Sequence, residues 1–332
     1  MKSQFMRCVA AALLCVLAAV SARAAEFELN YGHIQNPGHD LAVAPEHFKK
    51  LVEERTGGRV AISIFPSSQL GTAREMMEQC AMGTLDITFA GASDWASAIN
   101  VPGLAAFELP FLYDNLEAQK KLIDEILVAE CAEWLKGTGV RLLLTYSNGI
   151  RNPILKTKPI HTMEDLKGLK MRCPENPLFV DTWKYLGCNT VTSPWSEVYT
   201  VLSQGVADAA EADPVGLVNV NLQEVGKFYS RVAHMGSIYM VCINEDAWNG
   251  IPEDLQKIIL ECAVESETQQ IKGRQKNDDI AEEALAKAGV KLNDLNPGER
   301  ARMRVAVKPI HDNFAAKNNL RELVDRLLAL GE

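Results

Sequence analysis

In the first third of the chain, the spacing of hydrophobic positions alternates between that of a strand and that of a helix. Short apolar runs typical of strands occur at residues 26–31 and 59–65, and another ends the segment 65–90. Between the first two runs, apolar residues recur at helical spacing: Leu41, Ala44, Phe48, Leu51 and Val52. Gly57, Gly58 and Gly83 end the predicted helices. Strands that alternate with helices are typical of a mostly parallel sheet, so the predicted fold class is α/β.

The same alternation between residues 165 and 214 brings polar groups to one edge of a second sheet. An apolar strand at residues 169–171 leads to Arg172, and Pro174 stops further pairing. The elements predicted next are a helix, a strand, a helix and a strand, at residues 178–185, 190–192, 196–204 and 206–209. The chain then returns to this edge at Glu211 and Asp213. Open α/β sheets bind ligands at such an edge, so the sequence predicts a ligand site around Arg172.

Two longer apolar runs connect the two halves of the chain. Residues 140–146 and 234–242 are too apolar for a surface, so we interpret them as strands that cross from one lobe to the other and back. After the first run, the motif SNGIRNP predicts a turn that carries Asn148 and Arg151. Both side chains are therefore expected near the boundary between the lobes.

The last third of the chain is predicted to be mostly helical. From residue 252 a helical pattern meets only one glycine, Gly273, before Gly289, which favours one long helix across both lobes. A strand follows within residues 289–300, and residues 300–330 predict one terminal amphipathic helix. Another helix is predicted earlier, at residues 116–135.

The length of the chain favours two lobes, because 332 residues exceed what one hydrophobic core usually supports. We predict a first lobe of residues 25–147 and 239–278, and a second lobe of residues 148–238 and 279–332. Residues 1–24 combine Lys2 and Arg7 with an apolar run and a small-residue cleavage site, which predicts a signal peptide cleaved after about Ala24.

Charge and motif content exclude several classes of function. Removal of residues 1–24 takes away three cations and no anions, so the formal charge falls from −9 to −12, which argues against nucleic-acid binding. The six remaining cysteines are widely spaced, and we assign them neither a disulfide nor a metal site. No nucleotide-binding, hydrolase or zinc-protease motif occurs. We therefore expect no cofactor, no metal and no enzymatic activity.

Several motifs together resemble the substrate-binding proteins of TRAP transporters, which are tripartite periplasmic carriers. The matching segments, in the family's order and spacing, are residues 65–90, 108–115, 147–153, 165–174, 186–211 and 252–259. The resemblance implies a periplasmic, monomeric protein whose two α/β lobes close over a small organic anion like a hinged clamp, with crossing strands and a long helix along both lobes. It also implies docking on a small and a large integral membrane subunit.

The resemblance assigns roles to individual residues of the second lobe. It implies that Arg172 binds the carboxylate, that Arg151 supports it, and that Trp195 lines the pocket, with Tyr199 on the helix that follows. A guanidinium matches two oxygens of a carboxylate or sulfonate at once, which a lysine cannot do. Sialic-acid-binding relatives carry a Glu and an Arg where this chain has Gly91 and Asp94, which argues against sialic acid.

The chain departs from the family where an asparagine usually contacts the ligand. Its segment is one residue longer, and Asp213 or Glu211 is the stand-in. Either carboxylate could hold an arginine in place or accept a hydrogen bond from the ligand. A carboxylate that faces an anion favours a ligand that also carries a donor, such as a hydroxylated acid or sulfonate.

The full set of predicted ligand-contacting residues combines both lobes. From the second lobe and the crossing strand it contains Arg172, Arg151, Trp195, Asp213, Glu211, Asn148, Tyr199 and Glu175, and from the first lobe Asn36, His39, Ser93 and Asp94. Two other functions stay open at this point: an exported enzyme acting on a small organic acid, and a binding protein of another transporter class. A sensor role and the identity of the ligand also stay open.

Overall fold

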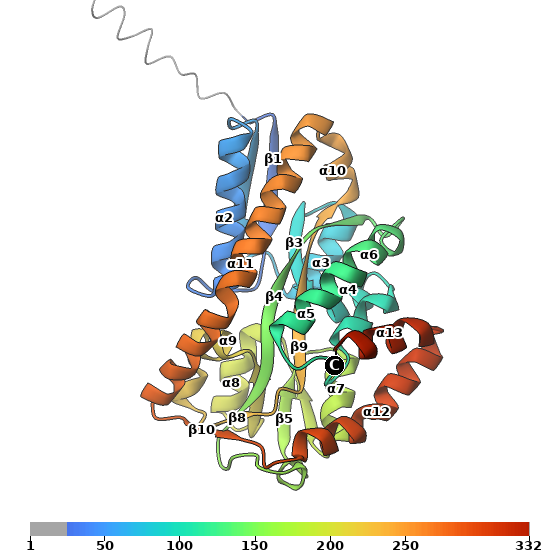
Figure 1. Ribbon diagram of the computed structural model, residues 1–332. Coiled ribbons are helices and arrows are strands. Elements are labelled where there is room, and N and C mark those ends of the chain that lie inside the picture. Colours follow the sequence, from blue (N-terminus) through green and yellow to red (C-terminus); the bar gives the residue numbers. More distant parts are fainter. Residues whose placement is uncertain (1–24, 332) are drawn as a thin grey trace, which may run out of the picture.

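The computed structural model describes residues 25–331, so the predicted signal peptide lies outside the described residues. Ten strands form one continuous sheet system with the order β2-β1-β3-β9-β4-β7-β5-β6, and β8 and β10 extend it from β4. The strands divide into two groups that share β4 and form two lobes (Figure 1). The α/β class predicted from the sequence is confirmed.

The first lobe repeats the strand and helix alternation predicted from its apolar pattern. Strand β1 pairs in parallel with both β2 and β3. The elements are β1 (Phe27–Gly32), α2 (Asp40–Arg55), β2 (Val60–Phe65), α3 (Ala73–Met82), β3 (Ile87–Gly91) and α4 (Ala92–Ala98). Thr72 begins α3 with a capping box completed by Glu75, and Gly83 ends it in the left-handed conformation.

The second lobe holds parallel strands that pair on both sides of β5. Its elements are β5 (Lys170–Cys173), α7 (Pro177–Tyr185), β6 (Asn189–Thr192), α8 (Val198–Ser203), β7 (Ala209–Ala212), α9 (Pro214–Asn219), β8 (Phe228–Arg231) and β10 (Lys291–Asp294). The strand predicted at residues 206–209 is thus three residues too early. Gly205 and Val206 still close the turn after α8, and Val206 is half exposed.

Strands β4 (Val140–Leu155) and β9 (Met235–Asn244) pass between the lobes and pair antiparallel along most of their length. The predicted turn at residues 147–153 is wrong, because β4 continues through it as one strand of 16 residues. A β-bulge between Ser147 and Ile150 absorbs the irregularity, and Gly149 adopts a φ of 70° there. Asn148 and Arg151 therefore lie on a strand shared by both lobes.

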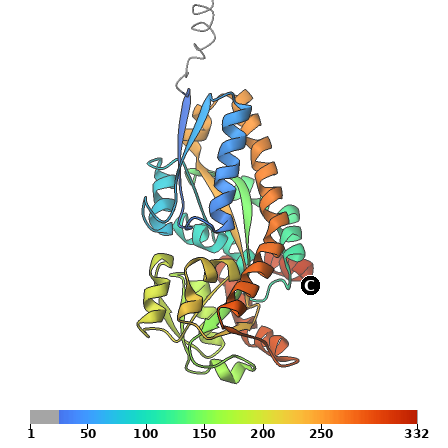
Figure 2. The same ribbon diagram turned by 90° about the vertical axis from the view of Figure 1, so that its left-hand side faces the viewer.

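Helix α11 (Glu253–Lys287) is a single helix of 35 residues, as predicted. At 1.5 Å per residue it is about 52 Å long. It packs against α2 and β4 and continues past α9, so it runs along both lobes (Figures 1 and 2). Gly273 lies inside the helix and does not interrupt it.

The predicted terminal helix of residues 300–330 is two helices. Asn319 adopts a left-handed φ of 56° and separates α12 (Glu299–Asn318) from α13 (Arg321–Gly331). The helix expected at residues 116–135 consists of α5 (Leu116–Leu122), a π-helical turn (Ile123–Leu127) and α6 (Val128–Trp134). Helix α13 packs on α5, whereas α12 packs on α7, so the chain end links the lobes.

The interior of the described chain is divided among three apolar clusters. All six cysteines of residues 25–331 are buried and unpaired. Burial raises the pKa of Cys80 and Cys188 to about 12. Within the described residues, no helix is both long and apolar enough to cross a membrane.

Candidate functional site

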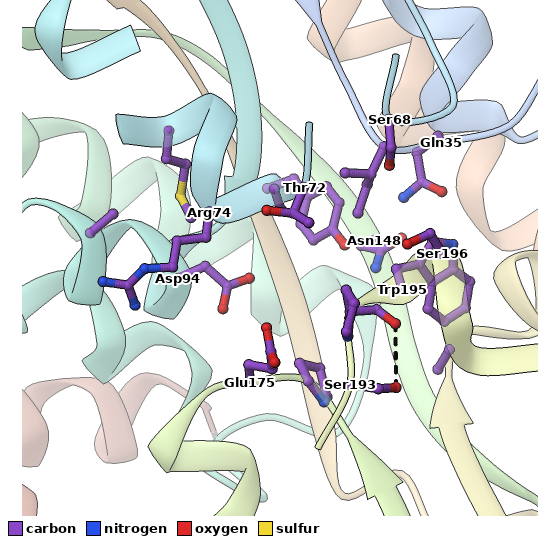
Figure 3. A pocket seen from close by; sticks show the side chains of 18 of the residues that line it. Gln35, Ser68, Thr72, Arg74, Asp94, Asn148, Glu175, Ser193, Trp195 and Ser196 are labelled. Atoms are coloured by element: carbon purple, nitrogen blue, oxygen red, sulfur yellow. Dashed lines mark hydrogen bonds between the residues drawn. The ribbon is translucent and has the colours of Figure 1, made fainter. Parts of the chain in front are cut away.

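A cavity of about 120 Å³ lies between the lobes and is lined by residues of both. Figure 3 shows the labelled side chains around one space, with Ser68 and Thr72 on one side and Glu175 and Ser193 on the other. Asn148 and Arg151 of the crossing strand β4 also line this cavity. The edge of the second sheet at which the sequence predicts a ligand site therefore faces polar side chains of the first lobe.

Arg172 is the most unusual side chain of the cavity. It lies within β5, between β6 and β7, and is only 1% exposed. Its Nε donates to Ser193 Oγ at 3.1 Å and its Nη2 donates to the Ser193 carbonyl, but its Nη1 has no partner among the described residues. Burial lowers its pKa to about 10.

Trp195 lies against the same guanidinium. The ring centre is 5.8 Å from the guanidinium carbon of Arg172, which is within cation–π range. Its indole Nε1 is buried without a hydrogen-bond partner among the described residues. Arg172 and Trp195 thus both line the cavity and both hold an unused donor.

Arg151, in contrast, has a complete counter-charge. Its Nε and Nη2 donate to the Glu211 carboxylate at 2.6 and 2.9 Å, and its guanidinium lies 5.1 Å from the Phe179 ring. Burial would raise the pKa of Glu211, but Arg151 and His234 lower it to about 2. Glu211 lies within β7 and does not line the cavity.

Asp213, unlike Glu211, lines the cavity. The two carboxylates between which the sequence could not decide therefore have different positions. Asp213 is the N-cap of α9 and accepts from Gly216 N at 2.9 Å. Arg274 of α11 donates to the same carboxylate at 2.6 Å. Burial would raise the pKa of Asp213, but Arg274 and His39 hold it far below its usual range.

Of the remaining predicted residues, four more line the cavity: Asn148, His39, Asp94 and Glu175. The amide Oδ1 of Asn148 is buried without a partner among the described residues. Sequence reasoning missed several polar side chains that also line the cavity: Gln35, Ser68, Thr72, Arg74, Ser193 and Ser196. They lie in turns and helix starts of ordinary composition, where no motif marks them.

Three predicted residues lie elsewhere in addition to Glu211. The Tyr199 hydroxyl donates to Glu224 at 2.8 Å, and Asn36 contributes its carbonyl to the start of α2. Ser93 accepts from Asn176 Nδ2 at 3.0 Å and is bonded to the buried Glu108. None of the three lines the cavity. Their ligand contacts stay predictions that this geometry does not favour.

Asp94, which lines the cavity and is partly exposed, and the buried Glu108 form a second acidic group. Asn176 of the second lobe donates to Asp94 Oδ1 at 2.8 Å, so one amide bridges the lobes. Burial raises the pKa of Glu108 to about 7, and the nearby Asp94 contributes in the same direction. No trio of His, Cys, Asp or Glu side chains in residues 25–331 is arranged to hold a metal ion.

A model of a known protein family matches residues 31–318, and its description is bacterial extracellular solute-binding protein, family 7. A solute-binding protein of Roseobacter denitrificans is 33% identical over 263 residues, covering 76% of this chain and 78% of the relative. The 2,3-diketo-L-gulonate-binding periplasmic protein of Escherichia coli is 30% identical and covers 81% of each chain.

A solved structure has the same architecture. The crystal structure of a TRAP periplasmic solute-binding protein from Roseobacter denitrificans, with bound β-D-glucuronate, is similar with a TM-score of 0.85 at 28% identity. The match covers 91% of this chain and 99% of that one. The two-lobe architecture with its long helix is therefore that of a known class of binding proteins.

Proposed function

We propose that this chain, which belongs to the bacterial extracellular solute-binding protein family 7, captures a small organic anion between its lobes through Arg172. The resemblance read from the sequence is confirmed by the family match, and the relatives are binding proteins of transporters rather than enzymes.

The observation that carries the proposal is the unmatched charge of Arg172. The guanidinium is buried, has one unused nitrogen donor and contacts no carboxylate of the described chain directly, although Glu211 and Glu175 are close enough to raise its pKa against the effect of burial. A buried cation without a counter-charge is unfavourable, and a ligand carboxylate would satisfy both the charge and the free donor. Arg151 does not need such a ligand, because Glu211 already neutralises it.

The other groups around the cavity favour a hydroxylated anion. The Asn148 Oδ1 lacks a partner among the described residues, and Asp213 and Asp94 offer further acceptor oxygens, which a ligand hydroxyl can satisfy and a plain dianion cannot. A hydroxyl-rich carboxylate supplies donors to these groups while its acid end binds Arg172. The sugar-derived acids in the names of two relatives, β-D-glucuronate and 2,3-diketo-L-gulonate, have this chemistry.

The mechanism is binding without covalent chemistry. A ligand held by Arg172 in the second lobe and contacted by Gln35 or His39 of the first favours the closed arrangement through contacts that exist only there. We infer that the closed protein, exported to the periplasm by its predicted signal peptide, delivers the anion to TRAP membrane subunits.

A thermal-shift panel tests the proposal directly. The panel contains D-glucuronate, D-galacturonate, 2,3-diketo-L-gulonate, succinate and isethionate. A ligand at about 100 times its dissociation constant adds roughly 2.7 kcal/mol to the free energy of unfolding, so a binder is visible as a raised melting temperature. We expect a sugar acid to give the largest shift and Arg172→Ala to abolish it.

Two outcomes would contradict the proposal. An equal shift in the wild-type chain and in Arg172→Ala would remove the carboxylate role of Arg172. Conversion of the bound acid into a product during incubation would favour the exported enzyme instead, and recovery of unchanged ligand by mass spectrometry would support a binding protein.

A further inference from the structure

Arg274 lies on α11 behind the cavity, and its side chain is completely buried. It contacts carboxylates from three parts of the chain. Nη1 lies 3.2 Å from Asp40 Oδ1 at the start of α2, in the first lobe. Nη2 lies 2.6 Å from Asp213 Oδ2 in the second lobe and 2.5 Å from Asp278 Oδ1 of α11 itself. One guanidinium thus joins both lobes to the long helix.

The position of this guanidinium is fixed by the crossing strand. A Cβ on Gly149 would lie 2.9 Å from Arg274 Nε and Nη2, so only glycine leaves room for the side chain. One turn earlier on α11, Gln270 accepts from Ser147 N at 3.0 Å and donates to Asp40 at 3.1 Å. The bulge in β4 and the start of α2 therefore hold Arg274 from two sides.

Arg274 in turn fixes Asp213 relative to the cavity. The Oδ2 atom of Asp213 accepts from both Arg274 and Gly216 N. Its Oδ1 atom has no hydrogen bond to the described residues and belongs to a side chain that lines the cavity. One carboxylate oxygen is held in place, and the other stays available.

We propose that Arg274 is a positioning residue for ligand binding: it neutralises Asp213, orients its free oxygen toward a ligand hydroxyl, and links the two lobes through Asp40. This inference deepens the proposed function and rests on it. An unpaired carboxylate next to the ligand would repel an anion, whereas a carboxylate paired with Arg274 can accept a hydrogen bond without that repulsion. The anion therefore meets a free cation at Arg172 and a neutralised acceptor at Asp213.

The test compares three variants, each first shown to be folded by circular dichroism. Arg274→Lys keeps the charge but cannot span three carboxylates. Asp40→Asn removes only the partner in the first lobe. Glu282→Gln is the matched control, because it breaks another ion pair of α11 with the second lobe, that with Arg231, away from the cavity.

Two measurements separate positioning from general stability. Hydrogen exchange of the Gly216 amide reports whether Asp213 stays in place, and it needs no ligand. Calorimetry with D-glucuronate reports binding. We expect Arg274→Lys to accelerate Gly216 exchange and to lower affinity, each by about tenfold or more, which for affinity is about 1.4 kcal/mol. Asp40→Asn should lower affinity about fivefold while Gly216 exchange stays within twofold of the wild type, and Glu282→Gln should change neither.

Unchanged Gly216 exchange in Arg274→Lys would overturn the inference, as would equal losses of affinity in Arg274→Lys and Glu282→Gln. If Arg274→Lys does not fold, wild-type affinity in Asp40→Asn would overturn the link between the lobes. If the wild-type chain does not bind D-glucuronate, the proposal that its ligand is a sugar acid of this kind fails. Exchange of the Gly216 amide, which needs no ligand, still decides whether Arg274 fixes Asp213.

Discussion

Arg172 and Arg274 are both buried guanidiniums beside the same cavity, yet their surroundings are opposite. Among the described residues, Arg172 hydrogen-bonds only to Ser193, whereas Arg274 contacts three carboxylates. Each guanidinium keeps one buried nitrogen without a partner in the described chain, Nη1 of Arg172 and Nε of Arg274, so the difference between them lies in the counter-charge. Burial lowers the pKa of Arg172 to about 10, while the surrounding carboxylates raise the pKa of Arg274 above its usual value despite its burial.

The difference indicates that Arg172 is available to bind a ligand, whereas Arg274 holds elements of the fold together. A charge left unpaired in the interior costs stability until a partner arrives, so it is suited to binding. A charge with several fixed partners holds elements together, and its removal leaves those partners unpaired. Four experiments can break or refine this distinction.

The largest expected effect concerns stability. Arg274→Met leaves the buried Asp213 and the partly buried Asp40 and Asp278 without their shared cation, which should lower the free energy of unfolding by on the order of 3–5 kcal/mol. Arg172→Met is the matched control: it breaks no ion pair and removes only the two hydrogen bonds to Ser193, so we expect a clearly smaller loss. Urea denaturation without ligand measures both. Equal losses in the two variants would remove the distinction.

The second effect concerns affinity. Arg172→Ala removes one partner of a buried charge-assisted pair with the ligand, so it should weaken binding by about 2–5 kcal/mol, or roughly 30-fold to several thousandfold. Arg172→Lys should also lose much of the affinity, because it lacks the planar fork. Calorimetry with the best acid of the panel measures both, and wild-type affinity in either variant would refute the assignment.

The third effect extends the comparison to a buried acid that has no cation. An unfolded chain releases the Glu108 proton near pH 4.5, but the folded chain keeps it to about pH 7. The folded state therefore holds more protons between these values, and its stability falls as the pH rises through this window. The contribution is on the order of 3 kcal/mol.

Glu108→Gln should reduce this slope and leave the smaller contribution of Asp278, whose pKa burial raises to about 6, whereas the exposed Glu117→Gln should retain the full slope. Urea denaturation at pH 4.5, 5.5 and 7 provides the measurement. A slope of wild-type size in Glu108→Gln would mean that Glu108 is already ionised in the folded protein below pH 7.

The smallest effect concerns Trp195. Trp195→Leu keeps an apolar lining but removes the aromatic face beside Arg172, which is worth about 0.5–1 kcal/mol at such sites. We expect a loss of affinity of about two- to fivefold, measured by calorimetry. A loss as large as that of Arg172→Ala would instead indicate that the indole binds the ligand directly.

The sequence was sufficient for the alternation of strands and helices, for α11 and for the position of Arg172, because these depend on local periodicity. It was misleading at residues 147–153, where glycine and proline usually indicate a turn. Here the bulge accommodates Gly149, and Pro153 lies opposite Glu211 of β7. The paired strand, rather than the local preference, determines the conformation.

Arg274 could not be found from the sequence for a different reason. An arginine four residues before Asp278 in a polar helix normally indicates an exposed i, i+4 pair. Its burial depends on Asp40 and Asp213, which are 234 and 61 residues away in the chain. For Glu211 the sequence left two roles open, a counter-charge for an arginine or a ligand contact, because only the pairing of β4 with β7 brings it against Arg151.

The shielded cysteines make this protein convenient for site-specific labelling. Maleimides react with the thiolate, and burial keeps the six thiols of residues 25–331 protonated as well as inaccessible at neutral pH. Single cysteines introduced at the exposed Lys121 and Lys227, one in each lobe, would then be the reactive pair. A donor and acceptor dye at these positions could follow the distance between the lobes while every natural cysteine of the folded chain is kept.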